Sequence, residues 1–334
     1  MLPSPYPISD HFNGSHFHNP ELEKTPDRRG FRELLRWQLD RRGRGVWPSQ
    51  VIDPVYPPPT KPGPGEAVIT FIGHASFLLQ LPGITLITDP HFSTHASPVR
   101  GIGPRRVRAP GIALQDLPPI DVVLVSHNHY DHLDLPSLRA LQRAHAPKSV
   151  TLLGNARFMA PSGLQALELD WWQDIEIGEL RITATSARHF SRRGLLDGNR
   201  ALWGGFMLHH SGGAVFFAGD SGAGPHWAQI GAKLGAPDLA LLPIGAYEPR
   251  WLMKPVHMNP DEALEAHVAL AARQSIAMHF GTFRLTDEAI DAPVERLAEV
   301  CAGSCVSNFE ALGVGESRRY PLNSSAGLDR VSDP

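Results

Sequence analysis

Residues 126–134 read Ser-His-Asn-His-Tyr-Asp-His-Leu-Asp and concentrate side chains that bind metal ions. Three imidazoles and one carboxylate fall within six positions, at His127, His129, Asp131 and His132. Neutral imidazole and carboxylate groups suit zinc, iron or manganese. The mostly apolar residues 121–125 come directly before them and predict a buried strand. Because such a polar cluster at a strand end is costly without compensation, the segment predicts a bound divalent ion.

The spacing of these residues favours an extended segment. On a helix, residues two apart point about 200° apart, so His127 and His129 would face away from each other. On an extended segment they share one face and can bind the same ion. Asp131 and His132 follow where the chain must turn, and they are free to face a second ion. The pattern therefore predicts two adjacent metal ions. The alternative, a solvated histidine-rich surface loop, is disfavoured.

Three further candidate ligands each follow a later predicted strand: His189, Asp220 and His279. A lone histidine or aspartate at a strand end is more often a capping or core residue. Ligands from several strand ends can, however, meet at one edge of the sheet in an α/β fold. Their joint occurrence after the first cluster therefore favours one shared metal site.

Apolar runs and alternating apolar and polar residues predict the strands that must position this site. These are residues 67–71, 76–81, 85–88, 121–125, 180–185, 214–218, 239–242 and 275–278. The first two are predicted to form a hairpin around residues 73–74. Helices are predicted to begin after Asn259, which is followed by a proline and two acids, and after Asp134.

The chain has 334 residues and 42% apolar content, enough for a large core. Residues 1–65 are rich in proline and arginine, with a short helical candidate at residues 31–41 and a proline-rich stretch after it. This composition predicts an extension that wraps the main body. Residues 66–323 are predicted to form the catalytic domain, and residues 324–334 a flexible tail.

Net charge and cysteine content limit the partners and the compartment. The net charge of −3 gives no general attraction to nucleic acid, and none is expected as a partner. No signal peptide and no apolar run of membrane-spanning length is visible. Cys301 and Cys305, four positions apart, fit a reducing environment and predict no disulfide framework. We expect a cytoplasmic protein, with peripheral contact to the inner face of the membrane left open.

The order of the candidate ligands, from His127-x-His129-x-Asp131-His132 to His189, Asp220 and His279, resembles the metallo-β-lactamase superfamily. Flanking segments resemble the bacterial relatives of N-acyl-phosphatidylethanolamine-hydrolysing phospholipase D. These segments are residues 117–134, 199–204 and 279–283, together with His16-Phe-His-Asn-Pro20. The resemblance covers residues 10 to 320 approximately. It implies an α/β fold, a four-layered αβ/βα sandwich, with a dinuclear zinc centre at one end.

The resemblance also implies a role for each ligand. His127, His129 and His189 would bind the first metal, Asp131, His132 and His279 the second, and Asp220 would bridge the two. Two zinc ions per chain are expected, with manganese or iron as alternatives. A hydroxide held between the ions would be the nucleophile, since two cations lower the pKa of bound water from about 15.7 toward neutrality. Asp131 and Asp220 therefore count as catalytic residues.

Two residues are expected to support the ligands from outside the centre. Asp89 follows the predicted strand at residues 85–88 and matches an early aspartate of the superfamily. It is expected to hold a ligand histidine in place. His74 is expected to act similarly, with a purely structural role as the alternative.

Four arginines precede the metal-binding strand, at Arg100, Arg105, Arg106 and Arg108. Of these, Arg105 and Arg106 are candidates for binding a phosphate group, and a solvated surface is the alternative. His257 is a candidate for assisting the leaving group or orienting the substrate, and capping of the following helix is the alternative. Tyr130 lies within the metal-binding segment and is expected to border the substrate pocket.

Three functions remain open at this point. A zinc-dependent phosphodiesterase of the phospholipase D type is favoured, acting on a phosphodiester or lipid-like small molecule. A lactonase or other ester hydrolase on the same centre is the main alternative, and a non-catalytic metal-binding protein is the third. No long amphipathic helix is visible for membrane docking. The scattered aromatic residues are expected to pack in the core or in linkers: Phe12, Phe17, Trp37, Trp47, Trp171 and Trp172.

Overall fold

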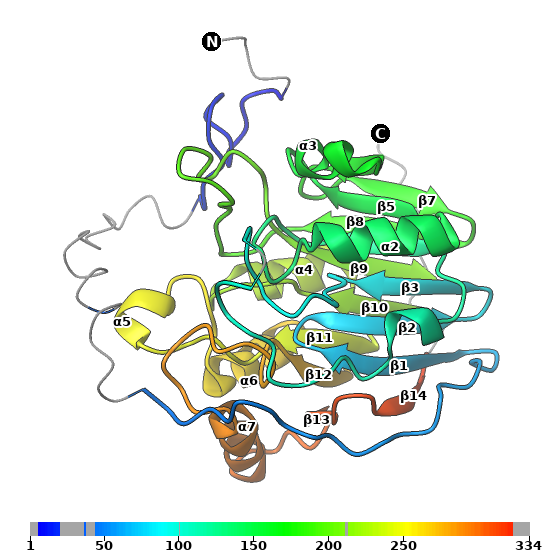
Figure 1. The fold of residues 1–334 in the computed structure, drawn as a ribbon, viewed down its shortest axis with the longest axis vertical. Coiled ribbons are helices and arrows are strands. Elements are labelled where there is room, and N and C mark those ends of the chain that lie inside the picture. Colours follow the sequence, from blue (N-terminus) through cyan, green and yellow to red (C-terminus); the bar gives the residue numbers. More distant parts are fainter. Residues whose placement is uncertain (1–5, 21–36, 38–43, 100, 211–212, 323–334) are drawn as a thin grey trace.

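In the computed structural model of the chain, two seven-stranded sheets lie face to face (Figure 1). The structure describes residues 6–20, 37, 44–99, 101–210 and 213–322. Most of the predicted helix at residues 31–41 and the predicted tail at residues 324–334 therefore lie outside the described residues.

The first sheet has the order β14-β1-β2-β3-β4-β5-β6. Its first strands pair antiparallel, whereas β3 to β6 run parallel. The strands are β1 (Glu66–Gly73), β2 (Ser76–Leu81), β3 (Ile84–Thr88), β4 (Val122–Val125), β5 (Lys148–Leu152), β6 (Ala166–Leu169) and β14 (Ser317–Pro321).

The second sheet has the order β13-β12-β11-β10-β9-β8-β7. It also divides into an antiparallel part, β7 to β10, and a parallel part, β10 to β13. The strands are β7 (Asp174–Ile177), β8 (Leu180–Thr185), β9 (Gly205–His210), β10 (Gly213–Phe217), β11 (Leu239–Pro243), β12 (Gln274–Met278) and β13 (Phe309–Glu310). The parallel parts matter for the site, because parallel strands end at a common edge.

Helices cover the outer face of each sheet and complete four layers. On the first sheet, Leu78 and Ile87 pack in one apolar cluster with Leu138 and Leu141 of α2. A second cluster fills the space between the sheets and extends under the helices of the second sheet. The helices are α2 (Leu135–His145), α3 (Ala156–Met159), α4 (His226–Leu234), α5 (Arg250–Met253), α6 (Pro260–Ala269) and α7 (Ala292–Ala302), with short 3₁₀ turns η1 (Leu114–Asp116) and η2 (Ala160–Ser162). The predicted αβ/βα sandwich is confirmed.

The local sequence signals account for eight of the fourteen described strands and for the starts of α2 and α6. All eight predicted strands are present, and β2 and β8 have the predicted bounds. Asn259 caps α6 as predicted: its side chain accepts a hydrogen bond from the amide of Glu262, whose carboxylate accepts one from the amide of Asn259. Asp134 precedes α2 as predicted, but its carboxylate accepts hydrogen bonds from Ser93 and Ser137 instead of capping the helix.

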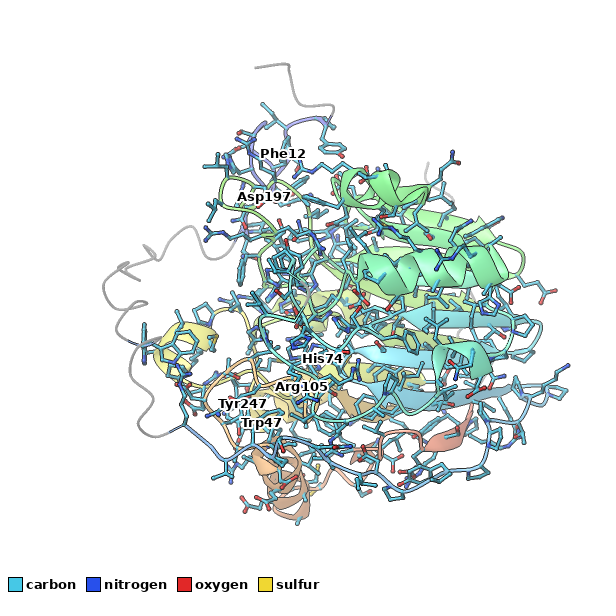
Figure 2. All side chains as sticks on the ribbon, viewed as in Figure 1. Phe12, Trp47, His74, Arg105, Asp197 and Tyr247 are labelled. Carbon is cyan, nitrogen blue, oxygen red and sulfur yellow. The ribbon has the colours of Figure 1, made fainter. Side chains whose placement is uncertain are left out.

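The described N-terminal residues lie against the main body. Phe12 and Phe17 are buried in the large cluster and Trp171 joins them there, which confirms core packing for these three aromatic residues. Figure 2 shows Phe12 and Asp197 at the same end of the molecule. Among the described residues, no helix combines the length and apolar character needed to cross a membrane.

Candidate metal centre

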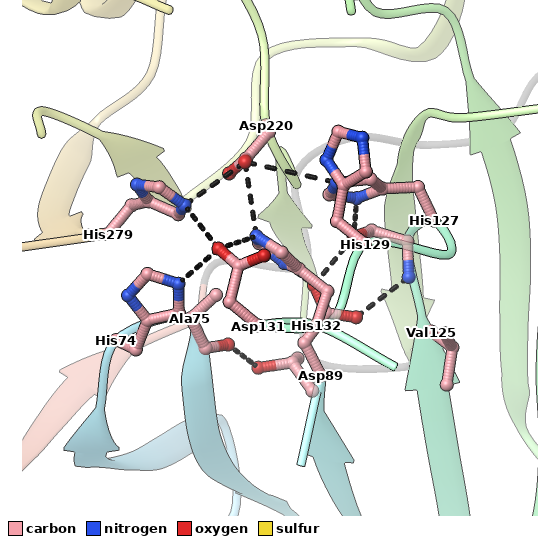
Figure 3. Close-up of polar contacts among 12 residues, drawn as sticks. His74, Ala75, Asp89, Val125, His127, His129, Asp131, His132, Asp220 and His279 are labelled. Carbon is pink, nitrogen blue, oxygen red and sulfur yellow. Dashed lines mark hydrogen bonds and ion pairs between the residues drawn. The ribbon is translucent and has the colours of Figure 1, made fainter. Parts of the chain in front are cut away.

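The candidate ligands meet where strands of both sheets end (Figure 3). The residues from 127 to 132 follow β4, and His189, Asp220 and His279 follow β8, β10 and β12. Three residues that directly follow β1, β3 and β12 have left-handed backbones, with φ of 60° at His74, 32° at Asp89 and 64° at His279. Such conformations are unfavourable for residues with a Cβ atom and often mark functional sites. The turns direct polar side chains toward one point between the sheets.

Three imidazoles form what we call the three-histidine group: His127, His129 and His189. His127 Nε2 lies 2.8 Å from His129 Nδ1, and His189 Nε2 lies 3.1 Å from the same atom. His127 and His189 are buried, and His129 is half-buried. Three nitrogen atoms from β4 and β8 thus converge as the ligands of one ion would.

Four residues form what we call the mixed group: His74, Asp131, His132 and His279. Asp131 Oδ2 is at its centre. It lies 2.9 Å from His74 Nε2, 3.3 Å from His132 Nε2 and 3.4 Å from His279 Nε2. A carboxylate oxygen and imidazole nitrogens again converge, with His74 close to the carboxylate of Asp131.

Asp220 lies between the two groups. Its Oδ2 atom is 3.1 Å from Nε2 of both His132 and His279 in the mixed group. The same atom is 3.8 Å from His189 Nε2 and 3.9 Å from His127 Nε2 in the three-histidine group. One carboxylate oxygen therefore contacts both groups of candidate ligands.

Hydrogen bonds from outside the centre orient the ligand side chains. Asp89 Oδ2 lies 2.6 Å from His132 Nδ1 and accepts a hydrogen bond from Ser126 Oγ, while Oδ1 accepts one from the Ser126 amide. His189 Nδ1 donates to the carbonyl of Val256 at 2.9 Å. In both histidines the Nδ1 atom is occupied, so that Nε2 faces the centre.

Charge is distributed unequally over the two groups. Burial lowers the pKa of His127 well below its ordinary value, and neighbouring imidazoles lower it further. Burial, assisted by His189, lowers the pKa of His129 to about 3, and burial lowers that of His189 to about 4. Burial also opposes the charged form of His279, but the carboxylates of Asp220 and Asp131 raise its pKa to about 9. The three-histidine group is therefore neutral, whereas the mixed group carries paired charges.

The donor set fits divalent metal ions. Asp220 Oδ1 is buried and has no hydrogen-bond partner among the described residues, and His132 Nε2 and His279 Nε2 face only the carboxylate oxygens of Asp131 and Asp220. Buried polar atoms without partners are costly, and coordination to a metal would compensate them. Neutral imidazoles on one side and imidazoles with carboxylates on the other are ligands that zinc, manganese and iron accept.

The other candidate site residues lie around this centre. His257 is buried, and its ring centroid is 5.0 Å from that of His189 and 5.4 Å from that of His279. Tyr130 lines a cavity of about 700 Å³ that adjoins the metal-binding segment. Its hydroxyl donates to the carbonyl of Arg193, whose guanidinium carbon lies 4.0 Å from the centre of the Tyr130 ring.

The arginines before β4 do not form one surface group. Arg105 is exposed, but Arg106 is buried and donates to the carbonyls of His91 and Ser93. Arg108 binds the Gly281 carbonyl and pairs with Asp53. The alternative of a solvated surface is therefore wrong for Arg106, which is buried and donates to a neighbouring loop, and its role in binding phosphate stays a prediction. Arg100 lies outside the described residues.

Two residues near the centre were not among the predicted site residues. His91 is fully buried, and its ring packs edge-on against Phe283 with 4.8 Å between centroids. Asn19 contacts the backbone of His189 through its side-chain amide. Asp89-Pro90-His91 was a visible signal, since another metal-binding residue type follows directly after Asp89. Asn19 lies in the segment His16-Phe-His-Asn-Pro20 that contributes to the family resemblance, but nothing in the segment indicated a contact with His189.

Comparisons with known proteins agree with this architecture. A family model described as a beta-lactamase superfamily domain matches residues 85–280. The chain is 39% identical over 244 residues to the N-acyl-phosphatidylethanolamine-hydrolyzing phospholipase D 1 of Caenorhabditis elegans, covering 69% of this chain and 68% of that protein. It is 37% identical over 236 residues to the mitochondrial protein of the same name from Saccharomyces cerevisiae, covering 68% of this chain and 50% of that protein.

The solved structure of a metallo hydrolase from Ignicoccus hospitalis superposes with a TM-score of 0.58. The superposition covers 77% of this chain and all of that chain at 22% sequence identity, and it supports the fold. Because the family model spans more than half of the chain, the protein belongs to the metallo-β-lactamase superfamily. Within that superfamily it is related to the N-acyl-phosphatidylethanolamine-hydrolysing phospholipases D.

Proposed function

We propose that this protein is a zinc-dependent hydrolase with a dinuclear centre that cleaves phosphodiesters of the N-acyl-phosphatidylethanolamine type. The observation that carries the proposal is the position of Asp220 Oδ2, which contacts the three-histidine group on one side and the mixed group on the other. A carboxylate oxygen between two sets of candidate ligands can bind two adjacent ions at once.

The ligand roles in this proposal follow the two groups. His127, His129 and His189 hold one ion, Asp131, His132 and His279 hold the other, and Asp220 belongs to both. Zinc fits these donors best, with manganese or iron as alternatives. When bound, two such ions lower the pKa of water and stabilise negative charge on the reacting phosphoryl oxygens.

His257 is proposed to orient the substrate. Burial holds the pKa of its imidazole well below the ordinary value, so that the ring is neutral near pH 7. Its Nδ1 atom is buried without a hydrogen-bond partner among the described residues. A neutral ring in that state accepts a hydrogen bond more readily than it donates a proton. This favours orientation of the substrate over protonation of the leaving group.

A lipid-like substrate is supported by the named activity of the two relatives and by the surroundings of the centre. The 700 Å³ cavity beside Tyr130 joins apolar walls to polar groups such as Arg193. The loop after His189 carries Leu195 and Leu196, which are 88% and 87% exposed. Exposed leucines beside arginines favour peripheral contact with a membrane surface. Arg105 remains a candidate for the phosphate group.

The test is a parallel assay of the zinc-loaded protein on three substrates. These are an N-acylated phosphatidylethanolamine in vesicles, a soluble aryl phosphodiester and a lactone. The proposal expects cleavage of both phosphodiesters at the bond to phosphorus. Cleavage of the lactone alone would replace the proposal with a lactonase. No turnover of any substrate, with no metal retained after gentle purification, would favour a non-catalytic protein.

A further inference from the structure

The described N-terminal residues 6–20 form a segment that packs on the loop carrying His189. Phe12 and Phe17 anchor this segment, with 3% and 1% of their surfaces exposed. The amide of Phe17 donates to the carbonyl of Asn199 at 2.7 Å, near the end of the same loop. The segment lies before residues 85–280, where the family model matches. A part of the chain outside the matched domain thus contacts the candidate metal centre.

The contact is made by the side-chain amide of Asn19. Its Nδ2 donates to the carbonyl of His189 at 2.8 Å, and its Oδ1 accepts from the amide of His189 at 3.3 Å. Both polar groups of one backbone residue are therefore satisfied by one side chain 170 positions away. Two such bonds fix the position and the direction of the peptide, as a neighbouring strand would.

His189 needs this support more than the other two members of its group. His127 and His129 lie in the short connection between β4 and α2, whereas His189 lies four residues beyond β8 in a longer loop that continues to Gly204. The ring is fixed at Nδ1 by the Val256 carbonyl. The backbone is fixed by Asn19. Together these contacts direct Nε2 toward His129 and Asp220.

We infer that Asn19 is a positioning residue for the ion of the three-histidine group, an inference that rests on the proposed dinuclear function. It acts through the backbone of His189 and does not touch the substrate. The N-terminal segment is accordingly part of the working metal centre. Loss of the Asn19 contacts lets the His189 loop move and weakens binding of one ion, while the mixed group keeps its own.

The experiment compares variants of the full chain by metal retention during titration with a chelator. Asn19→Ala removes both hydrogen bonds. Asn19→Asp keeps the shape but places an oxygen against the His189 carbonyl, so that it should behave like Asn19→Ala. For both variants, one zinc equivalent should be released at a chelator concentration about 10-fold or more below that for the wild type. The second equivalent should be released as in the wild type.

Asn13→Ala is the matched control. Asn13 lies in the same segment, but its side chain accepts from the amides of Ser15 and His16 within a local exposed turn. This variant should release both ions like the wild type. A second measurement follows hydrogen exchange of the His189 amide in metal-free protein. Exchange should accelerate about tenfold or more in the Asn19 variants and stay unchanged in Asn13→Ala.

Each outcome separates this inference from the proposed function. Unchanged metal release and unchanged His189 exchange in Asn19→Ala would overturn the inference. Equal release of both ions together with a lost unfolding transition would also overturn it, because that result describes general destabilisation. If Asn19→Asp released both ions as the wild type does, the hydrogen bond that Asn19 donates to the His189 carbonyl would be excluded as the positioning contact. Wild-type protein that binds no zinc would refute the dinuclear function, and the exchange measurement would still decide whether Asn19 holds the loop.

Discussion

The two groups of candidate ligands are held in different ways. In the mixed group, Asp131 contacts three imidazoles, and Asp89 fixes His132 from behind. His74 and His279 directly follow strands, whereas Asp131 and His132 lie in the same segment after β4 as His127 and His129. The three-histidine group instead contacts a serine hydroxyl at His127 and a backbone carbonyl at His189, together with the N-terminal segment through Asn19. The mixed group is therefore held by contacts among its own members and with Asp89, whereas the three-histidine group depends partly on the Val256 carbonyl and on the N-terminal segment.

The charges follow the same division. The carboxylates of Asp220, Asp131 and Asp89 raise the pKa of His132 well above its ordinary value against the effect of burial. Burial and neighbouring imidazoles lower those of His127 and His129. Negative charge is concentrated around the mixed group, and a cation is attracted more strongly there. We therefore expect the ion of the mixed group to bind more tightly than the ion of the three-histidine group.

Asp220→Asn should have the largest effect, because Asp220 is the residue that both groups share. The change removes the negative charge and leaves an amide nitrogen or a neutral oxygen at the bridging position. Turnover of the aryl phosphodiester should fall on the order of 10⁴-fold. Steady-state assays with excess zinc measure this effect, and circular dichroism checks that the fold persists.

The comparison predicts how this variant binds metal. Both zinc equivalents should be held more weakly, since each group loses a ligand. Retained turnover would remove Asp220 from the bridging role. Loss of only one zinc equivalent would mean that Asp220 binds a single ion. Only one of the two groups would then depend on Asp220, although its Oδ2 atom lies within 4 Å of both.

Asp89→Asn should act on the mixed group alone. Asp89 accepts the Nδ1 proton of His132, which leaves Nε2 free to bind metal. An asparagine amide nitrogen cannot accept that proton, and the other tautomer of His132 would place a proton on Nε2. Affinity for one zinc equivalent and turnover should each fall about 10- to 100-fold. Calorimetric zinc titration measures the affinity.

The control for this change is Asp116→Asn, an aspartate exposed on η1. It should match the wild type in zinc affinity and turnover. If Asp89→Asn lowered the zinc affinity of the three-histidine group as much as that of the mixed group, Asp89 would not act on the mixed group alone.

The sequence predicted the candidate ligands through two kinds of signal, and each group contains residues found by both. His127 to His132 form a cluster that is visible locally, and the strand before it fixes which residues share a face. His189, Asp220 and His279 were predicted because each follows an apolar run that ends in a turn. Ligands at strand ends are visible when the strands themselves are regular.

Contacts between distant segments could not be predicted in the same way. Asn19 and His189 are 170 positions apart, and neither apolar periodicity nor motif spacing links them. β14 was also missed, because its sequence, Ser-Arg-Arg-Tyr-Pro, is polar and forms an edge strand beside β1. The burial of Arg106 depends on how its loop folds over Phe283. In each case tertiary packing determines the role, and local composition does not report it.

Changes in the loop after His189 should have a smaller effect on turnover, and the effect should differ between a substrate in vesicles and a soluble substrate. Leu195→Ser combined with Leu196→Ser removes the exposed apolar side chains after His189. If these leucines enter a lipid surface, cleavage of the vesicle substrate should fall on the order of tenfold, the change expected from losing part of the burial of two leucines. Cleavage of the soluble aryl phosphodiester should be unchanged.

A matched pair of changes checks whether the position of the leucines matters. Ile52→Ser with Val55→Ser removes two equally exposed apolar residues from the proline-rich segment, which are 90% and 99% exposed. These changes should leave both assays unaffected. Equal losses on vesicles and on the soluble substrate would instead place Leu195 and Leu196 in support of His189.

The smallest expected effect concerns how the N-terminal segment is held. Burial disfavours protonation of His11, but hydrogen bonds to Asp170 and Asp10 outweigh it and raise the pKa of His11 above its ordinary value of about 6.5. The stabilisation of the folded state by protonated His11 is therefore fully present below the ordinary pKa of about 6.5, and it is lost as the pH rises through the raised pKa. His11→Gln can donate to Asp170 but cannot be charged. It should lower the melting temperature at pH 6 by about 2 °C or less, since partly exposed ion pairs contribute ~1 kcal/mol at most.

At pH 8 the difference between His11→Gln and the wild type should be smaller than at pH 6, because the charged form of His11 is lost as the pH rises through its raised pKa. Melting curves at both pH values measure it, with His16→Gln as the control within the same segment. A difference that grows toward pH 8 would show that the neutral ring, stacked on Trp171 with 4.4 Å between centroids, holds the segment by packing. The support of His189 by this segment would then not depend on pH, in contrast to the charge-paired mixed group.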